Sequence, residues 1–483
     1  MTDFVLKQLP YDLSGQAGLA LIGKYLKRIN INALVDPAWS VRSGVANSDV
    51  LKSYLGLLCL GKSDFDAIEG QRKDAFFARA LGLRAVPSSP TLRQRLDTHA
   101  ANWFDLADRI NAAVLGMKIG GKPVDFGVLP CGYVPLDVDT FAMDQSGTAK
   151  ELIGRTYTGV DGYCPFVAYL GTQGFCLEFD LRAGTQHSAS ETEHNLQRVL
   201  PMAAKLTPSP ILVRADSGFD SAKLMAAIAQ QRMQASPQTL GNPQTAVRDI
   251  AFIIKWNPRS TPVEDIAKAR CADAATQWVQ LRAGKRQCLW EESIQLGQEE
   301  KDKVAEGKEA EGKEAEGNDA KSQKVRRILR LTERTIDKRG QPLLLPLYTL
   351  EGWTTCLGKT FEAQHIIDLY ADHGTHEQFH SEFKTDMDLS RLPSGKFDTN
   401  YLVCALAAVA MNLLRLIGQH TLHDKDSPVR HPAQRRRMRT VMQELMFKAA
   451  RMISHARQWV LGLGANDKVF AVFQRHWHEL NTA

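Results

Sequence analysis

The stretch VPLDVDTF, residues 134–141, is where the chain changes from a helical to a strand-like pattern. Apolar and other residues alternate along it, as expected for a β-strand, in which successive side chains point to opposite faces. Asp137 and Asp139 are two positions apart, so we expect both carboxylates on one face of this strand. The stretch therefore predicts a sheet that carries acidic side chains on one side.

The segments that follow predict an α/β fold. Two further strand-like runs, 163–170 and 175–182, are joined by the turn GTQG. Helical and strand-like segments then alternate, at 191–206, 211–216, 221–231 and 251–256. Three strands followed by alternating helices and strands indicate a mixed sheet with helices packed on it.

Residues 1–125 have a helical pattern, with segments at 15–29, 48–61 and 88–96. The third segment predicts a helix with Ser89 as N-cap and Pro90 at the first helical position. Its Arg93 and Arg95 suit a DNA-reading helix, and an ordinary solvated helix face explains them equally well.

Residues 257–350 interrupt the α/β rhythm with short strand-like runs at 277–283 and 342–350. The repeat EGKEA-EGKEA-EGNDA, 306–320, has too little apolar surface to fold alone, so we expect a flexible linker at 304–322. From about residue 360 the helical pattern returns, and the C-terminal segment has a pattern typical of helix or loop. The basic cluster 430–439 in that segment suits either phosphate contact or a solvated surface.

The composition allows several classes of function. The 483 residues are 44% hydrophobic, and the net charge of +6 is compatible with nucleic acid without indicating it. The N-terminus lacks the pattern of a signal peptide, and the apolar run 402–414 contains Asn412 and is too short to span a bilayer, so we expect a buried helix there. Eight scattered cysteines without a C-x-x-C pair suit a cytosolic protein and argue against a zinc ribbon.

Two further acids stand out. Asp216 ends the apolar strand ILVRAD, and ligands collect at the carboxyl ends of strands in α/β sheets, although a lone aspartate there is more often a cap or turn residue. On a regular helix of about 100° per residue, Tyr370, His373, Glu377 and Lys384 fall within a stripe about 60° wide. These groups can bind metal and phosphate, and a salt-bridged amphipathic helix is the alternative.

The run HEQFH, residues 376–380, matches the zinc-protease pattern of two histidines one helical turn apart with a glutamate as general base. The extended metzincin pattern does not continue, since Phe383 and Asp386 occupy its glycine and third-histidine positions. A zinc metallohydrolase that uses HEQFH therefore remains an alternative, with its third ligand elsewhere.

Several motifs resemble one family. The pattern Y-x2-[RH]-x3-E-x6-K, formed by Tyr370, His373, Glu377 and Lys384, resembles the signature of DDE transposases in the insertion-sequence 4 superfamily, usually written with Arg at the second place. LDVDT…SGT…RTYTGVDGYCPFVAYLG, VRADSGFD and GTHEQFHSEFKTDMDLSRLPSGKFDTN are similar to its 1380 group. YDLSGQAGLALI and SDFDAIEGQRKDAFFARALGL…SSPTLRQRL extend the resemblance over nearly the whole chain.

The resemblance implies an α/β fold with an RNase-H-like mixed sheet and flanking helices. It implies a helical N-terminal domain, a β-rich insertion before the glutamate helix and a helical C-terminal region. The expected ranges are 1–125 for the DNA-binding domain, 126–256 and 351–425 for the two parts of the core, 257–350 for the insertion and 426–483 for the C-terminal region.

The resemblance also implies a site. Asp139, Asp216 and Glu377 would be catalytic and would bind two Mg²⁺ ions, with Mn²⁺ as a substitute, because hard cations prefer carboxylate oxygens. Asp139 is preferred to Asp137 because it precedes Thr140, and this choice stays open. Tyr370, His373 and Lys384 would contact DNA phosphates; His373 replaces the usual Arg, and an imidazole is a weaker, pH-dependent donor.

The implied function is cut-and-paste movement of an insertion sequence by phosphodiester hydrolysis and strand transfer. Expected partners are the double-stranded DNA of the element's terminal inverted repeats, target DNA and a second copy of the chain, in the bacterial cytoplasm with the nucleoid and without a membrane. If a hairpin intermediate forms, Tyr348 or Trp353 could stack on a flipped base, although a core role is more common for such aromatics. The alternatives are the zinc metallohydrolase and a catalytically inactive DNA-binding relic of a transposase.

Overall fold

The computed structural model describes residues 5, 6, 8, 10–234, 249–296, 324–465 and 467–482. The predicted linker 304–322 lies outside the described residues. The chain divides into two compact units. The helical unit takes residues 1–127, 140–186 and 377–483, and the sheet unit takes residues 128–139 and 187–376.

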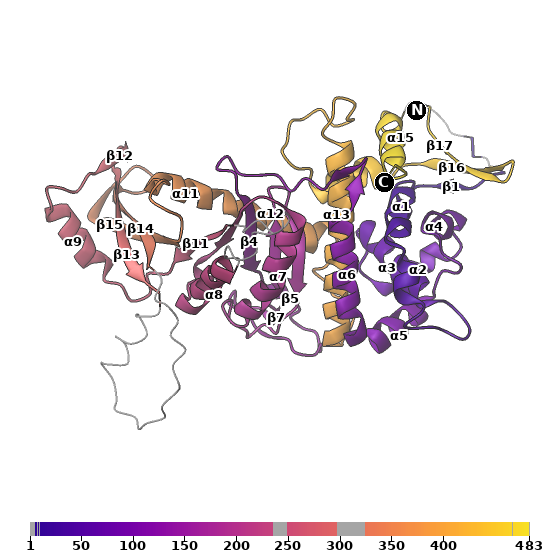
Figure 1. The fold of residues 1–483 in the computed structure, drawn as a ribbon, viewed down its shortest axis with the longest axis horizontal. Helices are drawn as coiled ribbons and strands as arrows, with labels where there is room; N and C mark the ends of the chain where they lie inside the picture. The colour runs from indigo at the N-terminus through magenta and orange to yellow at the C-terminus, as the bar shows by residue number, and fades with distance from the viewer. Residues whose placement is uncertain are drawn as a thin grey trace, which may run out of the picture. The chain divides into compact units, whose positions relative to one another are not determined.

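Parallel strands form the centre of the sheet unit. Strand β10 (Ile211–Ala215) pairs in parallel with β4 (Val134–Thr140) on one side and with β11 (Ile250–Trp256) on the other. Helix α7 (Thr192–Leu206) and helix α8 (Ala222–Gln234) alternate with these strands, and α8 packs on β11 (Figure 1). The mixed α/β character expected from the sequence is confirmed, because helices alternate with the parallel strands and β11 also has an antiparallel neighbour.

Antiparallel strands extend the same sheet beyond β11. They follow in the order β15 (Pro342–Thr355), β14 (Lys324–Ile336), β13 (Lys285–Gln295) and β12 (Val279–Arg282). The strand-like runs at 277–283 and 342–350 are thus strands, and helix α9 (Val263–Ala272) is an element that the sequence pattern did not reveal. A small core that includes Leu329, Leu331 and Leu350 lies between these strands and α9.

Helices dominate the helical unit, as predicted for the N-terminal region. They are α1 (Leu19–Ile29), α2 (Ile31–Val35), α3 (Asn47–Cys59), α4 (Ala75–Ala80), α5 (Ser89–His99), α6 (Phe104–Leu115), α13 (Phe397–Thr421), α14 (Met438–Val441) and α15 (Phe470–Glu479). The predicted cap of α5 was one residue late. Ser88 is the N-cap, because its Oγ accepts a hydrogen bond from the amide of Thr91 at 3.3 Å.

Helix α13 forms the core of this unit. It has 25 residues, its most apolar 18-residue window has a mean hydropathy of 1.9, and it is the one helix among the described residues that is long and apolar enough to cross a membrane. However, 94% of its apolar window is buried inside the protein, where it contacts α3, α6 and strand β9 (Phe175–Asp180). Asn412 binds the side chain of Asn111 at 2.7 Å and the backbone of Cys176. The predicted buried helix is confirmed.

Short strands complete the helical unit. Strand β8 (Phe166–Leu170) forms a hairpin with β9 through the predicted turn, and β5 (Met143–Asp144), β6 (Gly154–Arg155) and β7 (Asp161–Tyr163) form a small sheet of their own. The prediction of a purely helical C-terminal region is wrong. Strands β16 (Ala450–His455) and β17 (Gln458–Leu463) form a hairpin, and β1 (Leu13–Ser14) pairs with β16.

The C-terminal hairpin escaped prediction because of its turn. Ala456 and Arg457 both adopt the left-handed conformation, with φ of 47° and 62°. A two-residue hairpin turn needs such angles at both positions, and Asn or Gly is the usual sequence signal for them. Without those residues, this segment carries no local indication of a turn.

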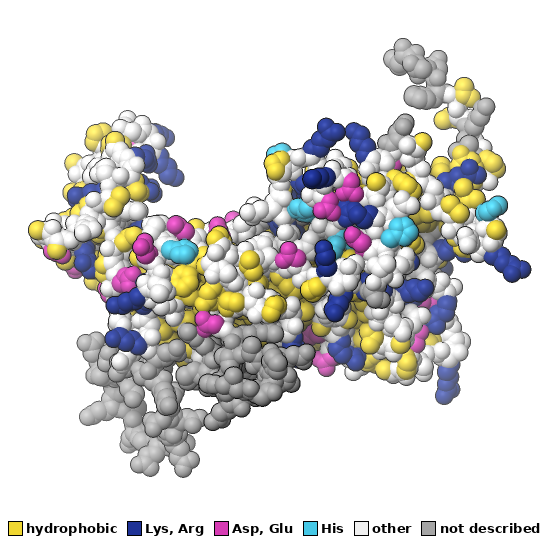
Figure 2. Space-filling view, turned by 45° about the horizontal axis from the view of Figure 1, so that its top comes forward, with side chains coloured by type: hydrophobic (Ala, Val, Ile, Leu, Met, Phe, Trp, Pro, Cys, Tyr) yellow, Lys and Arg dark blue, Asp and Glu magenta, His cyan; other side chains and the backbone are white. Residues whose placement is uncertain are grey.

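Side-chain charges are dispersed on the face shown in Figure 2. Lys and Arg side chains lie among acidic and apolar ones and do not form one continuous stripe there. This distribution agrees with the modest net charge of +6.

Candidate active site

The register of β4 and β10 sets the charges of the candidate site. Arg214 pairs with Asp137 in the parallel ladder, and Ala215 pairs with Val138. Asp216 and Asp139 follow at the carboxyl ends of these neighbouring strands. Because side chains alternate between faces, both acids of β4 lie on the same face. The expectation for Asp137 and Asp139 therefore holds.

Asp137 is neutralised by a cation. The Nε and Nη2 atoms of Arg214 donate to its two carboxylate oxygens at 2.6 and 2.8 Å, and His373 Nδ1 lies 3.1 Å from Oδ1. Burial by itself would raise the pKa of Asp137, but the charge of Arg214 and the hydrogen bond from His373 hold it well below its ordinary value. With both oxygens engaged, Asp137 is suited to structure and not to metal binding.

Arg214 was missed by the sequence reasoning. Its Nη1 also donates to the carbonyl of Leu369 at 2.7 Å, which ties helix α11 (Ala363–Ala371) to β10. A signal was present in the sequence, because a cation inside the apolar strand ILVRAD must find a buried partner. Asp137 in LDVDT is that partner.

Asp139 and Asp216 have electrostatic surroundings that differ from those of Asp137. Asp216 caps the short turn Ser217–Phe219, where its Oδ1 accepts a hydrogen bond from the amide of Gly218 at 2.9 Å. Burial and then the negative charge of Asp139 raise the pKa of Asp216, against the Gly218 hydrogen bond and the nearby histidines. Two carboxylates that repel each other at adjacent strand ends are a suitable ligand set for a hard divalent cation. This geometry favours Asp139 over Asp137 as the first acid.

Two histidines reach the acids of β4 from one tight turn. The chain passes from α11 to α12 (His376–Ser381) through a 3₁₀ turn at Asp372–Thr375. With about three residues per turn, positions i and i+3 of such a turn eclipse. The rings of His373 and His376 accordingly lie 4.0 Å apart. His373 contacts Asp137, while His376 Nε2 lies 2.5 Å from Asp139 Oδ2.

His376 belongs to the site, which the sequence reasoning missed. Its Nδ1 donates to the carbonyl of His373, so its Nε2 faces Asp139. Burial by itself would lower the pKa of His376, but the hydrogen bond to Asp139 and the charge of Asp139 raise it. The contact between His376 Nε2 and Asp139 holds the carboxylate in place.

The sequence predicts that Tyr370, His373, Glu377 and Lys384 share one face of a regular helix. This prediction is wrong. The segment runs from α11 through the 3₁₀ turn into α12 and then into a π-helical turn at Glu382–Asp386. A constant angle of about 100° per residue does not hold across these changes.

The predicted residues of this stripe have different surroundings. Tyr370 is half-buried, and burial followed by the charges of Asp216 and Asp139 raises the pKa of its phenol. His373 is buried against Asp137, which supports a structural role better than phosphate contact. The structure thus brings Asp139, Asp216 and Tyr370 together with these histidines in the sheet unit.

Glu377 and Lys384 belong to the helical unit. Glu377 is exposed in the first turn of α12, directly after His376 in the chain. Lys384 is half-buried; its Nζ donates to the carbonyl of Ala142 at 3.3 Å, and burial lowers its pKa. Both residues lie in helical segments, Glu377 in α12 and Lys384 in the π-helical turn.

Arg93 and Arg95 also belong to the helical unit. Arg93 is exposed above the ring of Phe65, and Arg95 donates weakly to Asn47 at 3.4 Å. Neither is locked in an ion pair with a buried acid, so their contact with DNA stays a prediction.

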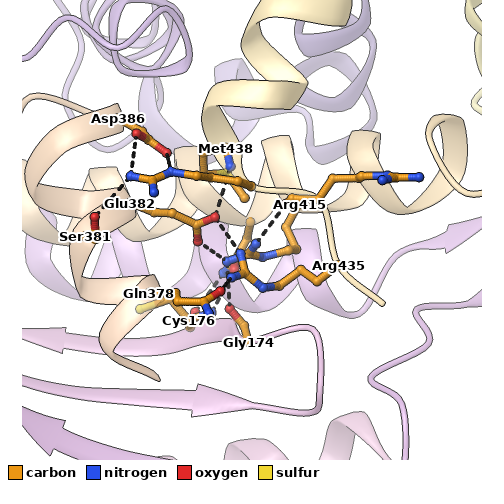
Figure 3. A network of polar contacts seen from close by, with 12 residues as sticks. Gly174, Cys176, Gln378, Ser381, Glu382, Asp386, Arg415, Arg435 and Met438 are labelled. Atoms are coloured by element: carbon orange, nitrogen blue, oxygen red, sulfur yellow. Dashed lines mark hydrogen bonds and ion pairs between the residues drawn. The ribbon is translucent and has the colours of Figure 1, made fainter. Parts of the chain in front are cut away.

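Buried ion pairs anchor the segment that follows Glu377 (Figure 3). Glu382 is fully buried and accepts hydrogen bonds from Arg415 Nη2 at 2.8 Å, Arg435 Nη1 at 2.5 Å and the amide of Met438 at 3.0 Å. Asp386 binds Arg437 Nε at 2.8 Å. These contacts fasten the π-helical turn to α13 and to residues 435–438.

The same contacts account for much of the basic cluster 430–439. Arg437 and Arg439 are both paired with Asp386, and Arg435 is paired with Glu382. Arg436 donates to backbone carbonyls at 422 and 431. These four guanidinium groups have partners within the protein, but Arg437 and Arg439 are still 44% and 54% exposed, so phosphate contact by the cluster stays a prediction.

The two aromatic candidates for base stacking have core surroundings. Trp353 is buried with Leu212, Ile253 and Ile328, so its expected core role is confirmed. Tyr348 packs on the neighbouring cluster of strands β14 and β15, and its hydroxyl donates to Glu333 at 2.9 Å.

Comparisons with known proteins give the family. The model described as "Transposase DDE domain" matches residues 134–413, and "Transposase DDE domain group 1" matches residues 11–244. No curated protein matches the chain. A cryo-EM structure of the piggyBac transposase synaptic complex with hairpin DNA is 10% identical, with a TM-score of 0.39 over 90% of this chain and 80% of that one. The family match covers more than half of the sequence, so this chain belongs to the DDE transposase family, which implies a metal-dependent DNA-processing enzyme.

Proposed function

We propose that this chain is an active DNA transposase of the insertion-sequence 4 superfamily, 1380 group, with an RNase-H-like core. It moves its element by cutting double-stranded DNA at the terminal inverted repeats and joining the ends to target DNA. The observation that carries this proposal is the pair Asp139 and Asp216, which end adjacent parallel strands and repel each other. Asp137, two residues away, is neutralised by Arg214 and provides the contrast.

The residues present fit divalent metal ions. Asp139, Asp216 and Glu377 would hold two Mg²⁺ ions, for which Mn²⁺ can substitute, since all three offer hard carboxylate oxygens. The raised pKa of Asp216 supports this, because a cation would relieve the repulsion from Asp139. When bound, such ions activate the attacking oxygen and stabilise the leaving oxygen of a phosphodiester.

The protein's own residues position this chemistry. Arg214 fastens β4 and α11 to β10, so the acids and the 3₁₀ turn keep their relative places. His376 holds the carboxylate of Asp139 and carries a proton at Nε2 that it can donate there. Tyr370 and Lys384 are proposed to donate to DNA phosphates, which positions the backbone without reading its sequence.

The whole-protein setting is part of the proposal. A second copy of the chain would pair the two DNA ends, and Arg93 and Arg95 would contact DNA from helix α5. The reaction would take place in the cytoplasm, at the nucleoid. The five domain ranges expected from the sequence likewise stay a prediction.

The alternatives have less support. A zinc metallohydrolase that uses HEQFH, residues 376–380, is the second candidate, and the match of residues 134–413 to a transposase domain favours the transposase over it. An inactive relic was suggested by His373 in place of arginine. In this chain His373 is bonded to Asp137 inside the sheet unit, so the replacement changes a buried structural contact.

The test is cleavage of a plasmid that carries the element ends, by the purified full chain in Mg²⁺. We expect double-strand breaks at the ends with the wild type and none with Asp216→Asn, while DNA binding is retained. Asp265→Asn is the matched control, because Asp265 is exposed on helix α9 of the same unit. Unchanged excision by Asp216→Asn would exclude catalysis by this triad. A wild type that binds but never cuts would identify a relic.

A further inference from the structure

A second group of metal-ligating side chains lies in the helical unit, on the last helix and the end of α13. His420 is near the end of α13, and His476 and Glu479 are one turn apart on α15, which lies beside α13 (Figure 1). One ligand atom from each residue lies within 4.8 Å of the others. All three residues belong to one unit, so the cluster is independent of the Asp139 and Asp216 pair.

The distances suit a small divalent ion. Tetrahedral zinc binds nitrogen and oxygen at about 2.0–2.2 Å, which places neighbouring ligand atoms about 3.3 Å apart. Glu479 Oε2 is 3.0 Å from His476 Nδ1 and 3.7 Å from His420 Nδ1. The observed separations bracket the expected one, so small side-chain movements would complete a three-ligand set.

The side chain of Tyr25 contacts the second ring nitrogen of His476. The hydroxyl of Tyr25, on α1, lies 2.9 Å from His476 Nε2, and both side chains are fully buried. A histidine that binds metal through Nδ1 carries its proton on Nε2 and normally donates it to a fixed acceptor. Tyr25 Oη is placed to be that acceptor.

The chemistry of the cluster suits a cation. It combines the carboxyl group of Glu479 with the imidazoles of His420 and His476, all of which offer a ligand atom. Arg475 lies 3.5 Å from Glu479 Oε1, but its main partners are Asp424 and Asp426 at 3.0 Å each.

We propose that His420, His476 and Glu479 bind a divalent transition-metal ion of the zinc class, with a fourth position open to water. Two imidazoles and one carboxylate are an established zinc ligand set, and mixed nitrogen and oxygen ligands do not suit Mg²⁺. With Tyr25 as support, the ion would join α1, α13 and α15 and so fasten the C-terminal helix to the N-terminal one. This proposal does not rest on the proposed transposase activity.

The experiment measures binding of Co²⁺, a visible analogue of Zn²⁺, to the untagged full chain. An Asp139→Asn, Asp216→Asn background removes the candidate active-site ligands from the measurement. We expect tetrahedral Co²⁺ absorption with one ion bound per chain, which Zn²⁺ displaces. His420→Asn should remove this ion, and Tyr25→Phe should weaken binding by about 10-fold.

The control is His478→Asn, because His478 is exposed on the same helix and is not part of the cluster. It should bind Co²⁺ as the background protein does. His420 and Glu479 are only 22% and 27% exposed, so Glu479→Gln serves as a second variant if His420→Asn does not fold. Absence of the Co²⁺ absorption from the background protein, or its persistence in folded His420→Asn or Glu479→Gln, would overturn the proposal.

Discussion

Two groups of buried acids in this molecule differ in whether a cation neutralises them. This difference separates acids with a structural role from acids suited to catalysis. Glu382, in the helical unit, is fully buried but is bound by Arg415 and Arg435. Asp216, in the sheet unit, is less buried but faces Asp139, and its pKa is raised, while that of Glu382 is lowered. Compensation of charge, and not depth of burial, therefore identifies the candidate site.

The strongest test of this comparison uses two acids on the same strand. Asp139→Asn should reduce DNA cleavage by at least about 10³-fold, as expected when a metal-holding group is lost, with little loss of stability. Asp137→Asn should instead lower the free energy of unfolding by about 3–5 kcal/mol, because Arg214 loses its buried partner. Plasmid cleavage and urea unfolding measure the two effects. If folded Asp137→Asn is inactive while Asp139→Asn cuts DNA, the first acid is Asp137.

The next test concerns the acid of the helical unit. Glu382→Gln should lower the free energy of unfolding by about 3–5 kcal/mol, because Arg415 and Arg435 remain buried without a charged partner. Glu444→Gln is the matched control: Glu444 pairs with Lys448 on the surface, and such a pair contributes about 1 kcal/mol or less. Equal losses for the two variants in urea unfolding would show that Glu382 has no special structural role.

Much of the fold was predictable from local patterns. The strands of 134–141, 211–216 and 251–256 form where alternation or apolar runs indicate them, and the helices between them follow. The C-terminal hairpin was not predictable, because its turn uses Ala456 and Arg457 in the left-handed conformation without a residue type that favours it.

The candidate site was predictable in its acids but not in its supporting residues. The two-residue spacing of Asp137 and Asp139 predicts that both side chains lie on the same face of a strand. Their different partners depend on the register with β10, which places Arg214 opposite Asp137 and is a property of the folded sheet. The role of His376 was hidden for a similar reason. A regular helical wheel does not describe the 3₁₀ turn that aligns it with His373.

Metal binding should act on the pair Asp139 and Asp216, and not on Glu382. Mg²⁺ at about 100 times its dissociation constant should raise the free energy of unfolding of the wild type by about 2.7 kcal/mol. Asp216→Asn should remove this response, because it deletes a ligand and relieves the repulsion from Asp139. Thermal unfolding with Mg²⁺ and with a chelator measures it. An equal response in Asp216→Asn would mean that the ion binds elsewhere.

A smaller effect is expected from the histidine beside Asp139. His376→Gln should slow DNA cleavage by about 10–100-fold, since groups that orient metal ligands have effects of this size. The transposase motif in the sequence assigns no role to His376. A matched variant is His365→Gln, at a histidine on α11 that lies against Phe361 and not against an acid of β4. Full activity of His376→Gln would show that its contact with Asp139 has no positioning role.

The smallest effect is in the pH dependence of stability. Burial by itself would raise the pKa of Glu382, but the charges of Arg415 and Arg435 outweigh it and lower the pKa. A carboxyl with a lowered folded pKa adds stability above its unfolded pKa of about 4.3, and that stability is lost as the pH falls through the folded value. Stability of the wild type should therefore fall steeply below about pH 4.3, and less steeply in Glu382→Gln. Asp137, whose pKa is also lowered, would maintain part of the slope in the variant. Identical slopes in urea unfolding from pH 5 downward would mean that Glu382 is not held ionised by its arginines, and the contrast with Asp216 would then disappear.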